Sequence, residues 1–207
     1  MGRGSLKTSS RPRMQSPGWS SGKTWKHWQV PDETLVLGLS DHLPKVGWKG
    51  LVCGNRARPR AVFMLWMTCN KRLATKDRLA KFGSNVDRGC AFCNSLETLD
   101  HMFFDCRYTK GVWEDVLRWL HVLHVPQGWN EEIAWLVKIC KSRNWRGQIM
   151  KMAIAETIYE TWWDRNLAVH SIVNSNKNTA KRIIDNIVYR VWGYPKFRRK
   201  LAQTLMP

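Results

Sequence analysis

The chain has 207 residues, 43% of them apolar, which is enough for one ordinary packed domain and a tail. Its 34 Lys and Arg residues outnumber its 16 Asp and Glu residues and give a formal net charge of +18, which favours a polyanion as the partner. No stretch approaches the roughly 18 consecutive apolar residues of a membrane-spanning helix, and the first residues lack the apolar centre of a secretory signal, so we expect no membrane partner.

The first 30 residues are rich in Gly, Ser, Pro and basic residues and contain no acidic residue. Three scattered tryptophans do not supply enough contiguous apolar surface to offset the entropy of ordering this segment. We therefore predict a disordered basic tail over residues 1–30. It either binds nucleic acid loosely or is a tail left from a larger chain, and its composition has some features of an organelle transit peptide.

Apolar residues recur with helical spacing through most of the remaining chain. Pro59 suits a helix start and Asn70 a helix end, whereas Thr75 suits an N-cap and Gly83 a C-terminal stop. Alternation typical of strands is scarce. The pattern predicts a mainly α protein with helices over residues 61–69, 76–82, 108–120, 131–140, 146–170 and 179–191.

Four metal-ligand residues lie within a short segment with the spacing C-x2-C-x7-H-x4-C, namely Cys90, Cys93, His101 and Cys106. Zn²⁺ takes four thiolate or imidazole ligands, and a two-residue gap lets one turn aim two sulfurs at one point. Without a secretory signal the cysteines are expected to be reduced, which favours a metal over disulfides. We predict a structural Zn²⁺ site, because four protein ligands leave no open position for catalysis and no βαβ pattern supports a redox pair.

The remaining candidate ligands lack partners at ligand spacing. Cys53, Cys69 and Cys140 are interpreted as buried small hydrophobic residues. His121 and His124 could share a helical face, but no cysteine or carboxylate pair accompanies them, so a second metal site is not predicted. The Trp pair at 162–163 is interpreted as core.

The sequence also resembles a known family. The resemblance is carried by Pro-Arg-Ala-Val-Phe-Met-Leu-Trp at 59–66, Asn-Lys-Arg-Leu-Ala-Thr-Lys-Asp-Arg-Leu at 70–79, the Cys-Ala-Phe-Cys at 90–93, Glu-Thr-Leu-Asp-His-Met-Phe-Phe-Asp-Cys at 97–106, and Val-Trp at 112–113. These segments resemble the zinc-binding domain that follows the polymerase in LINE-type (non-LTR) retrotransposon reverse transcriptases, especially those of plants. Arg107 departs from the proline that many relatives have after the last cysteine.

The resemblance implies that Cys90, Cys93, His101 and Cys106 are the zinc ligands and that the module helps a polymerase grip RNA or DNA. It implies a small helical domain with a CCHC zinc knuckle over residues 31–120, followed by a helical extension over 121–207. The paired aspartates of a polymerase and an acidic nuclease segment are both missing from the sequence, so we expect no enzyme activity. A reverse transcriptase polypeptide is a further candidate partner.

Basic residues are concentrated before and after the zinc segment. Residues 45–88 hold eleven basic and two acidic residues, whereas residues 89–170 hold nine and ten. We expect RNA or DNA to bind the first of these regions with little sequence preference, and the ring of Phe92 to be available to bases. The candidate contacts are Arg56, Arg58, Arg60, Lys71, Arg72, Lys76, Arg78, Lys81 and Arg88.

Three alternatives stay open at this point. The basic residues could form a solvated surface without a partner. The chain could be a protein-interaction or scaffold module that binds no nucleic acid, or a degenerate retroelement fragment without a cellular role. The sequence does not identify a location, although an intracellular, nuclear one is favoured.

Overall fold

The computed structural model describes residues 46–141, 144–170 and 178–205, which belong to one compact unit that begins at residue 45. The predicted disordered tail, residues 1–30, lies outside the described residues. The described helical elements are α2 (Lys49–Val52), α3 (Pro59–Cys69), α4 (Lys76–Lys81), the π-helical turn η1 (His101–Asp105), α5 (Arg107–Trp119), α6 (Trp129–Ile139), α7 (Trp145–Val169), α8 (Thr179–Trp192) and α9 (Pro195–Leu205).

The predicted fold class is confirmed, because the described residues are mainly helical and their only β-type pairing is an isolated bridge between Gly89 and Leu96. All six predicted helices are present, with ends within two residues of the prediction. Helices α2, η1 and α9 were not predicted from the sequence. Two of these are short, and α9 carries four basic residues that mask its apolar face.

Local signals account for several of the helix ends. Pro59 occupies the first turn of α3, and Gly83 follows α4 with a φ of +82°, a conformation that glycine adopts without steric cost. The Asn144 side chain accepts a hydrogen bond from the Gly147 N–H and caps α7. Thr75 holds the predicted N-cap position of α4, but its side chain is buried and makes no capping bond.

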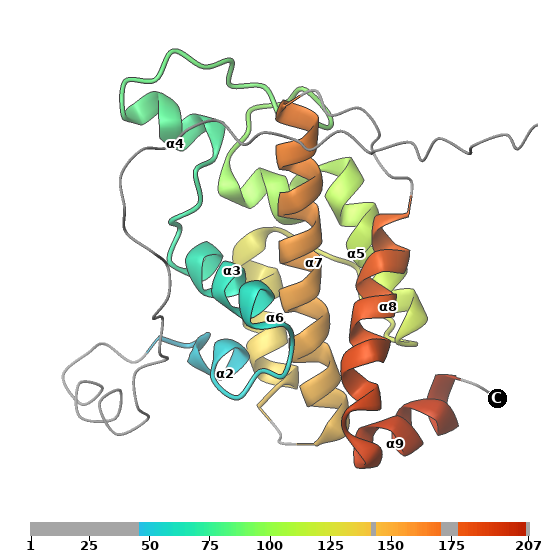
Figure 1. The fold of residues 1–207 in the computed structure, drawn as a ribbon. Coiled ribbons are helices and arrows are strands. Elements are labelled where there is room, and N and C mark those ends of the chain that lie inside the picture. Colours follow the sequence, from blue (N-terminus) through green and yellow to red (C-terminus); the bar gives the residue numbers. More distant parts are fainter. Residues whose placement is uncertain (1–45, 142–143, 171–177, 206–207) are drawn as a thin grey trace, which may run out of the picture. The chain divides into compact units, whose positions relative to one another are not determined.

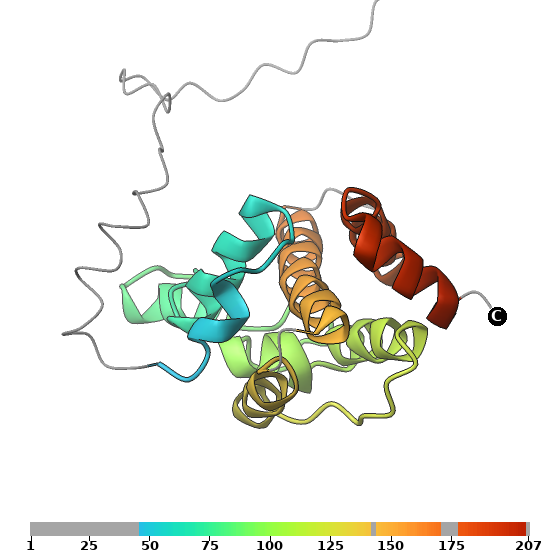
Figure 2. The same ribbon diagram turned by 90° about the horizontal axis from the view of Figure 1, so that it is seen from below.

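Helix α7 runs through the centre of the described unit, and α3, α5, α6 and α8 pack around it (Figures 1 and 2). Its apolar side chains Ile149, Met152, Ile154 and Ile158 are fully buried. Helices from both sides of residue 120 therefore share one core. The domain boundaries at residues 30 and 120 stay predictions. None of the described helices is both long and apolar enough to cross a membrane.

A row of carboxylates is also buried along α7. Glu156, Glu160 and Asp164 follow one another at four-residue intervals and so lie on one face of the helix. Arg58 pairs with the first two at 2.5 and 2.6 Å, and Arg182 of α8 pairs with the last two at 3.0 and 2.5 Å. Each buried carboxylate therefore has an arginine partner, and these ion pairs connect α3 and α8 to α7.

One core prediction is wrong. Trp163 is 52% exposed, and only its neighbour Trp162 is half-buried. The two side chains point in different directions because consecutive helical residues lie about 100° apart. Arg165 lies over the Trp162 ring, 4.9 Å from its centre, and helps to cover it.

Candidate metal centre

The first two candidate ligands, Cys90 and Cys93, lie in a tight turn. The Cys90 N–H donates to the Ser95 carbonyl at 2.6 Å, and the Asn94 N–H donates to the Cys90 carbonyl at 3.0 Å. Asn94 has a φ of +63°, which asparagine tolerates better than most residues. A Cβ atom at Gly89 would lie 2.6 Å from the Asn94 side-chain oxygen, so any other residue at position 89 would require the Asn94 side chain to shift.

The other two candidate ligands, His101 and Cys106, lie at the two ends of η1. The Thr98 hydroxyl accepts a hydrogen bond from the His101 N–H at 3.0 Å, and the Cys106 N–H donates to the His101 carbonyl at 2.7 Å. Between the two, Met102, Phe103 and Phe104 are buried in the core. The η1 turn is therefore anchored by apolar packing, and Cys106 directly precedes α5.

These two pairs meet at one point. The four ligand atoms all lie within 4.8 Å of one another, with the Cys90 and Cys106 sulfurs 3.9 Å apart. The Cys93 sulfur lies 3.1 Å from His101 Nε2. In a tetrahedral site with Zn–S bonds of about 2.3 Å, two sulfurs lie about 3.8 Å apart. The arrangement fits one Zn²⁺, and no ligand needs to leave its place in the turn or in η1.

The surroundings of the cluster favour thiolate at Cys90. The hydrogen bond with Cys106 is the largest of the effects that lower the pKa of Cys90, and the N–H groups of Phe92 and Cys93 lower it further. The same contact with Cys90, together with burial, raises the pKa of Cys106. Because Zn²⁺ binds thiolates, a metal ion at this position would replace the thiol protons of the cluster.

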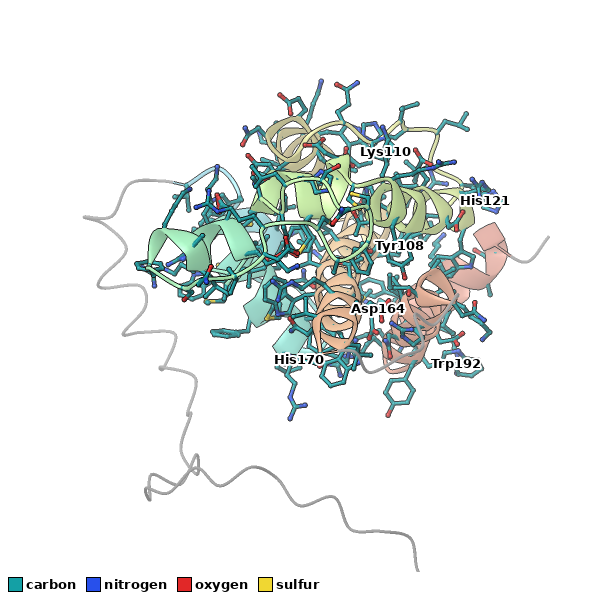
Figure 3. All side chains as sticks on the ribbon, turned by 90° about the horizontal axis from the view of Figure 1, so that it is seen from above. Tyr108, Lys110, His121, Asp164, His170 and Trp192 are labelled. Carbon is teal, nitrogen blue, oxygen red and sulfur yellow. The ribbon has the colours of Figure 1, made fainter. Side chains whose placement is uncertain are left out.

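The cluster is shielded on one side and open on the other. Cys90 and Cys106 are buried, whereas Cys93 is exposed and His101 is half-buried. Phe92, expected to offer its ring to bases, instead stacks on Tyr108 with 4.4 Å between the ring centres. Tyr108 in turn donates a hydrogen bond to Asp164 of α7 at 3.2 Å, and Figure 3 shows these two side chains near the centre of the unit.

The turn is also joined to α4. Lys76 Nζ donates to the Gly89 carbonyl at 2.6 Å and lies 3.2 Å from Asp87. The Lys76 N–H donates to Glu97 Oε1 at 2.9 Å, and this fully buried carboxylate pairs with Arg165 of α7 at 2.5 Å. Sequence reasoning missed Glu97 and Arg165, because no local pattern reveals a pair of residues that is 68 positions apart.

The other candidate ligands do not join a metal cluster among the described residues. Cys140 is buried as predicted, whereas Cys69 is half-buried. Burial raises the pKa of Cys69 to about 12 and that of Cys140 to about 11. The prediction for Cys53 is wrong, because this side chain is exposed just after the short helix α2.

The two remaining histidines also lie apart. His121 follows the end of α5 with a φ of +53°, so it does not share a helical face with His124. His124 stacks on Trp135, with 3.6 Å between the ring centres, and lies 2.8 Å from the buried carboxylate of Glu132.

The nine basic residues predicted to contact nucleic acid fall into two groups at opposite ends of α3. One group surrounds α4 and the zinc turn, and we call it the α4 surface: Lys71, Arg72, Lys76, Arg78, Lys81 and Arg88. In this surface, Lys71, Lys76 and Lys81 have carboxylates 3.9, 3.2 and 2.9 Å away. No carboxylate of the described residues lies within ion-pair distance of the three arginines.

The second group, Arg56, Arg58 and Arg60, lies at the start of α3. Eleven residues of helix separate it from the α4 surface, a distance of about 16 Å. Arg58 is occupied by Glu156 and Glu160, so its role in the structure is that of an ion-pair partner. Arg56 lies over the rings of Tyr194 and Phe197 at 4.5 and 5.1 Å, which places it beside α9.

The chain matches a known protein family over part of its length. Residues 19–113 match the family described as zinc-binding in reverse transcriptase, so the match covers somewhat less than half of the chain and includes all four clustered ligands. No curated protein and no solved structure gives a significant match. Residues 19–113 are therefore similar to the family of zinc-binding domains of reverse transcriptases, and they carry a Cys3His cluster of a geometry that can bind zinc.

Proposed function

We propose that this chain is a non-catalytic nucleic-acid-binding module derived from a LINE-type retrotransposon reverse transcriptase. In this proposal Cys90, Cys93, His101 and Cys106 are the ligands of one structural Zn²⁺. The convergence of their four ligand atoms within 4.8 Å supports that assignment. Four protein ligands fill a tetrahedral site, so the metal serves the fold and not a reaction.

The α4 surface is proposed as the contact for RNA or DNA. The observation that carries this step is that Arg72, Arg78 and Arg88 have no acidic partner among the described residues, although the surface lies beside the zinc turn. Arg78 also lies over Phe82, a ring that is 74% exposed. Guanidinium groups in such positions pair readily with phosphates, and contacts to the backbone carry little sequence preference.

Zinc has a direct part in this proposal. Helix α4 has six residues and no buried side chain, so it cannot hold its place by apolar packing. Its first residues are held by the Gly89 carbonyl and by the main chain and side chain of Glu97, which lie on either side of the metal turn. Zn²⁺ would therefore fix the position of the α4 surface without touching the nucleic acid. A reverse transcriptase polypeptide is a further proposed partner, and a membrane is not.

The test is binding of the zinc-loaded chain to labelled single-stranded RNA and duplex DNA over a salt series. Each lost phosphate contact reduces the slope of log affinity against log salt by about 0.9 for duplex DNA. The triple variant Arg72→Ala, Arg78→Ala, Arg88→Ala should therefore lower both the affinity and the slope. Lys138→Ala on α6 is the control, because this exposed residue lies outside the α4 surface.

Two outcomes would count against this function. Binding that does not respond to salt, or no binding to either nucleic acid, would favour a scaffold role or a fragment without a role. A triple variant that binds as Lys138→Ala does would move the contact away from the α4 surface. Circular dichroism of both variants must match the parent chain, so that a loss of binding is not a loss of fold.

A further inference from the structure

A second surface with basic and aromatic side chains lies at the other end of the unit, outside the residues that match the zinc-binding family. It is a groove of about 400 Å³ between α5, α8 and α9, which we call the α9 groove. Its lining includes Trp119, Val191, Trp192, Arg198, Arg199 and Leu201. Figure 1 shows α8 and α9 meeting in a corner at the end of the unit away from α4.

The indole of Trp192 is the main exposed feature of this groove. It is 61% exposed, although Val191 beside it is buried, and Figure 3 shows it at the margin of the unit. Arg198 lies over the indole ring, 5.3 Å from its centre. An exposed indole ring loses the favourable free energy of apolar burial, and the arginine beside it supplies a positive charge at the same place. The indole ring can stack on a nucleic-acid base, and the adjacent guanidinium can pair with the phosphate of the same strand.

The charge of residues 189–205 indicates the chemical class of the partner. Residues 189–205 contain five basic residues, Arg190, Lys196, Arg198, Arg199 and Lys200, and no acidic residue. Arg56, from the start of α3, joins them through its contacts with Tyr194 and Phe197. A polyanion is the complementary partner. Its bases must be unpaired to reach the Trp192 ring, because a duplex offers only its backbone to such a groove.

We propose that the α9 groove binds single-stranded nucleic acid, with a base stacked on Trp192 and the adjoining phosphates held by Arg198 and Arg199. This site is separate from the α4 surface, and it does not depend on zinc, because α9 packs against α8 and not against the zinc turn. The two surfaces together would contact one strand at both ends of the unit. The groove thus adds a preference for single strands that the α4 surface alone does not provide.

The experiment compares two tryptophan variants of the zinc-loaded full chain by fluorescence anisotropy. The probes are a labelled 20-nucleotide oligouridine and a labelled 20-base-pair DNA duplex. Trp192→Ala should weaken binding to oligouridine about five- to hundredfold and leave duplex binding nearly unchanged. The matched control is Trp163→Ala, which removes a tryptophan of similar exposure in the last turns of α7, whereas Trp192 is the last residue of α8.

A charge variant and a combined variant keep this test independent of the proposed function. Arg198→Ala with Arg199→Ala should weaken oligouridine binding and reduce its salt dependence. In the Arg72→Ala, Arg78→Ala, Arg88→Ala background, Trp192→Ala should still weaken whatever single-strand binding is left. If that triple variant binds normally and Trp192→Ala does not, the proposed contact at the α4 surface fails and the α9 groove stands.

Three results would overturn the proposal for the α9 groove. The first is equal binding of oligouridine by Trp192→Ala and Trp163→Ala. The second is equal weakening of single-strand and duplex binding by Trp192→Ala. The third is Trp192-dependent binding to vesicles of phosphatidylserine and phosphatidylcholine with no binding to oligouridine, which would assign the groove to an anionic membrane surface. Unchanged circular dichroism and melting of each variant exclude a folding defect.

Discussion

In the zinc turn and α4, order comes from a few polar contacts that converge on four ligands, whereas in α7 it comes from burial along a long helix. Helix α4 buries no side chain, and the turn is held by backbone bonds and by Lys76. Helix α7 buries most of its 25 residues and compensates its buried carboxylates with Arg58 and Arg182. We therefore expect the zinc turn and α4 to depend on the metal and the core around α7 to be independent of it.

Zinc removal should have the largest effect and should separate the two parts. Structural zinc sites contribute ~10–16 kcal/mol of apparent binding free energy. Chelation should therefore open the turn at residues 89–95 and release α4, while η1, α7 and α8 keep their core. Hydrogen–deuterium exchange should rise over residues 76–95 and stay low in the middle of α7. Cys106→Ser should lose the metal, whereas Cys53→Ser, which alters an exposed thiol, should keep one Zn²⁺ per chain.

Two results would contradict this prediction. A purified chain without zinc, or one with the same exchange and melting in strong chelator, would show that the turn orders itself. The zinc turn and α7 would then not differ in their dependence on the metal.

The contact that couples the two parts is the buried pair of Glu97 and Arg165. Arg165→Met leaves the Glu97 carboxylate without its cation, and the free energy of unfolding should fall by about 3–5 kcal/mol. Adding Glu97→Gln should recover part of this loss, because the charge is removed while an acceptor for the Lys76 N–H remains. Urea denaturation measures both values.

Lys181→Ala is the matched control for this pair. Its partner Asp185 is exposed, and such surface pairs contribute at most about 1 kcal/mol. If Arg165→Met were no worse than this control, the pair would not couple the zinc turn to α7.

The reactivity of the cysteine thiols should also distinguish the zinc turn from the core around α7. Burial raises the pKa of Cys69 to about 12 and that of Cys140 to about 11, so at pH 8 their reactive thiolate forms are minor. Both should react with iodoacetamide at least roughly 100-fold more slowly than exposed Cys53, with or without zinc, and Cys69 should be the slower of the two. Cys93 is exposed but should react only after chelation, because the metal holds its sulfur. Mass spectrometry of peptides taken over time gives the rates, and rapid labelling of Cys93 in zinc-loaded protein would contradict its role as a ligand.

The smallest expected effect is a gain of stability in the metal-independent part. Gly111 lies within α5, and a Cβ atom there meets nothing within 4 Å. Gly111→Ala should stabilise the chain by about 0.5–1 kcal/mol through helix propensity and leave the zinc affinity unchanged. Gly89→Ala makes the opposite comparison, because its Cβ would press on Asn94 and should weaken zinc binding. Thermal melting and competition with a chromogenic chelator measure the two quantities, and equal effects of both variants on zinc would contradict the assignment.

Local sequence was sufficient for the features that depend on neighbouring residues. The two-residue gap between Cys90 and Cys93 predicted a shared turn, and the apolar spacing predicted six helices to within two residues. Local sequence did not predict burial where burial depends on residues that are distant in the chain. Cys53 and Trp163 were expected in the core and are exposed. The π-helical turn that places His101 and Cys106 also has no local signature.

Local sequence was enough to identify residues that can ligate a metal and the ends of most helices, because hydrogen-bonded turns and side-chain periodicity act over a few residues. The surroundings of each positive charge, in contrast, depend on the packing of the helices. Arg58 became an ion-pair partner of α7, Arg56 joined α9, and Arg72 stayed without a described acidic partner. The physical reason is that the effect of a charge depends on carboxylates and rings brought near it from distant parts of the chain, and packing alone fixes those distances.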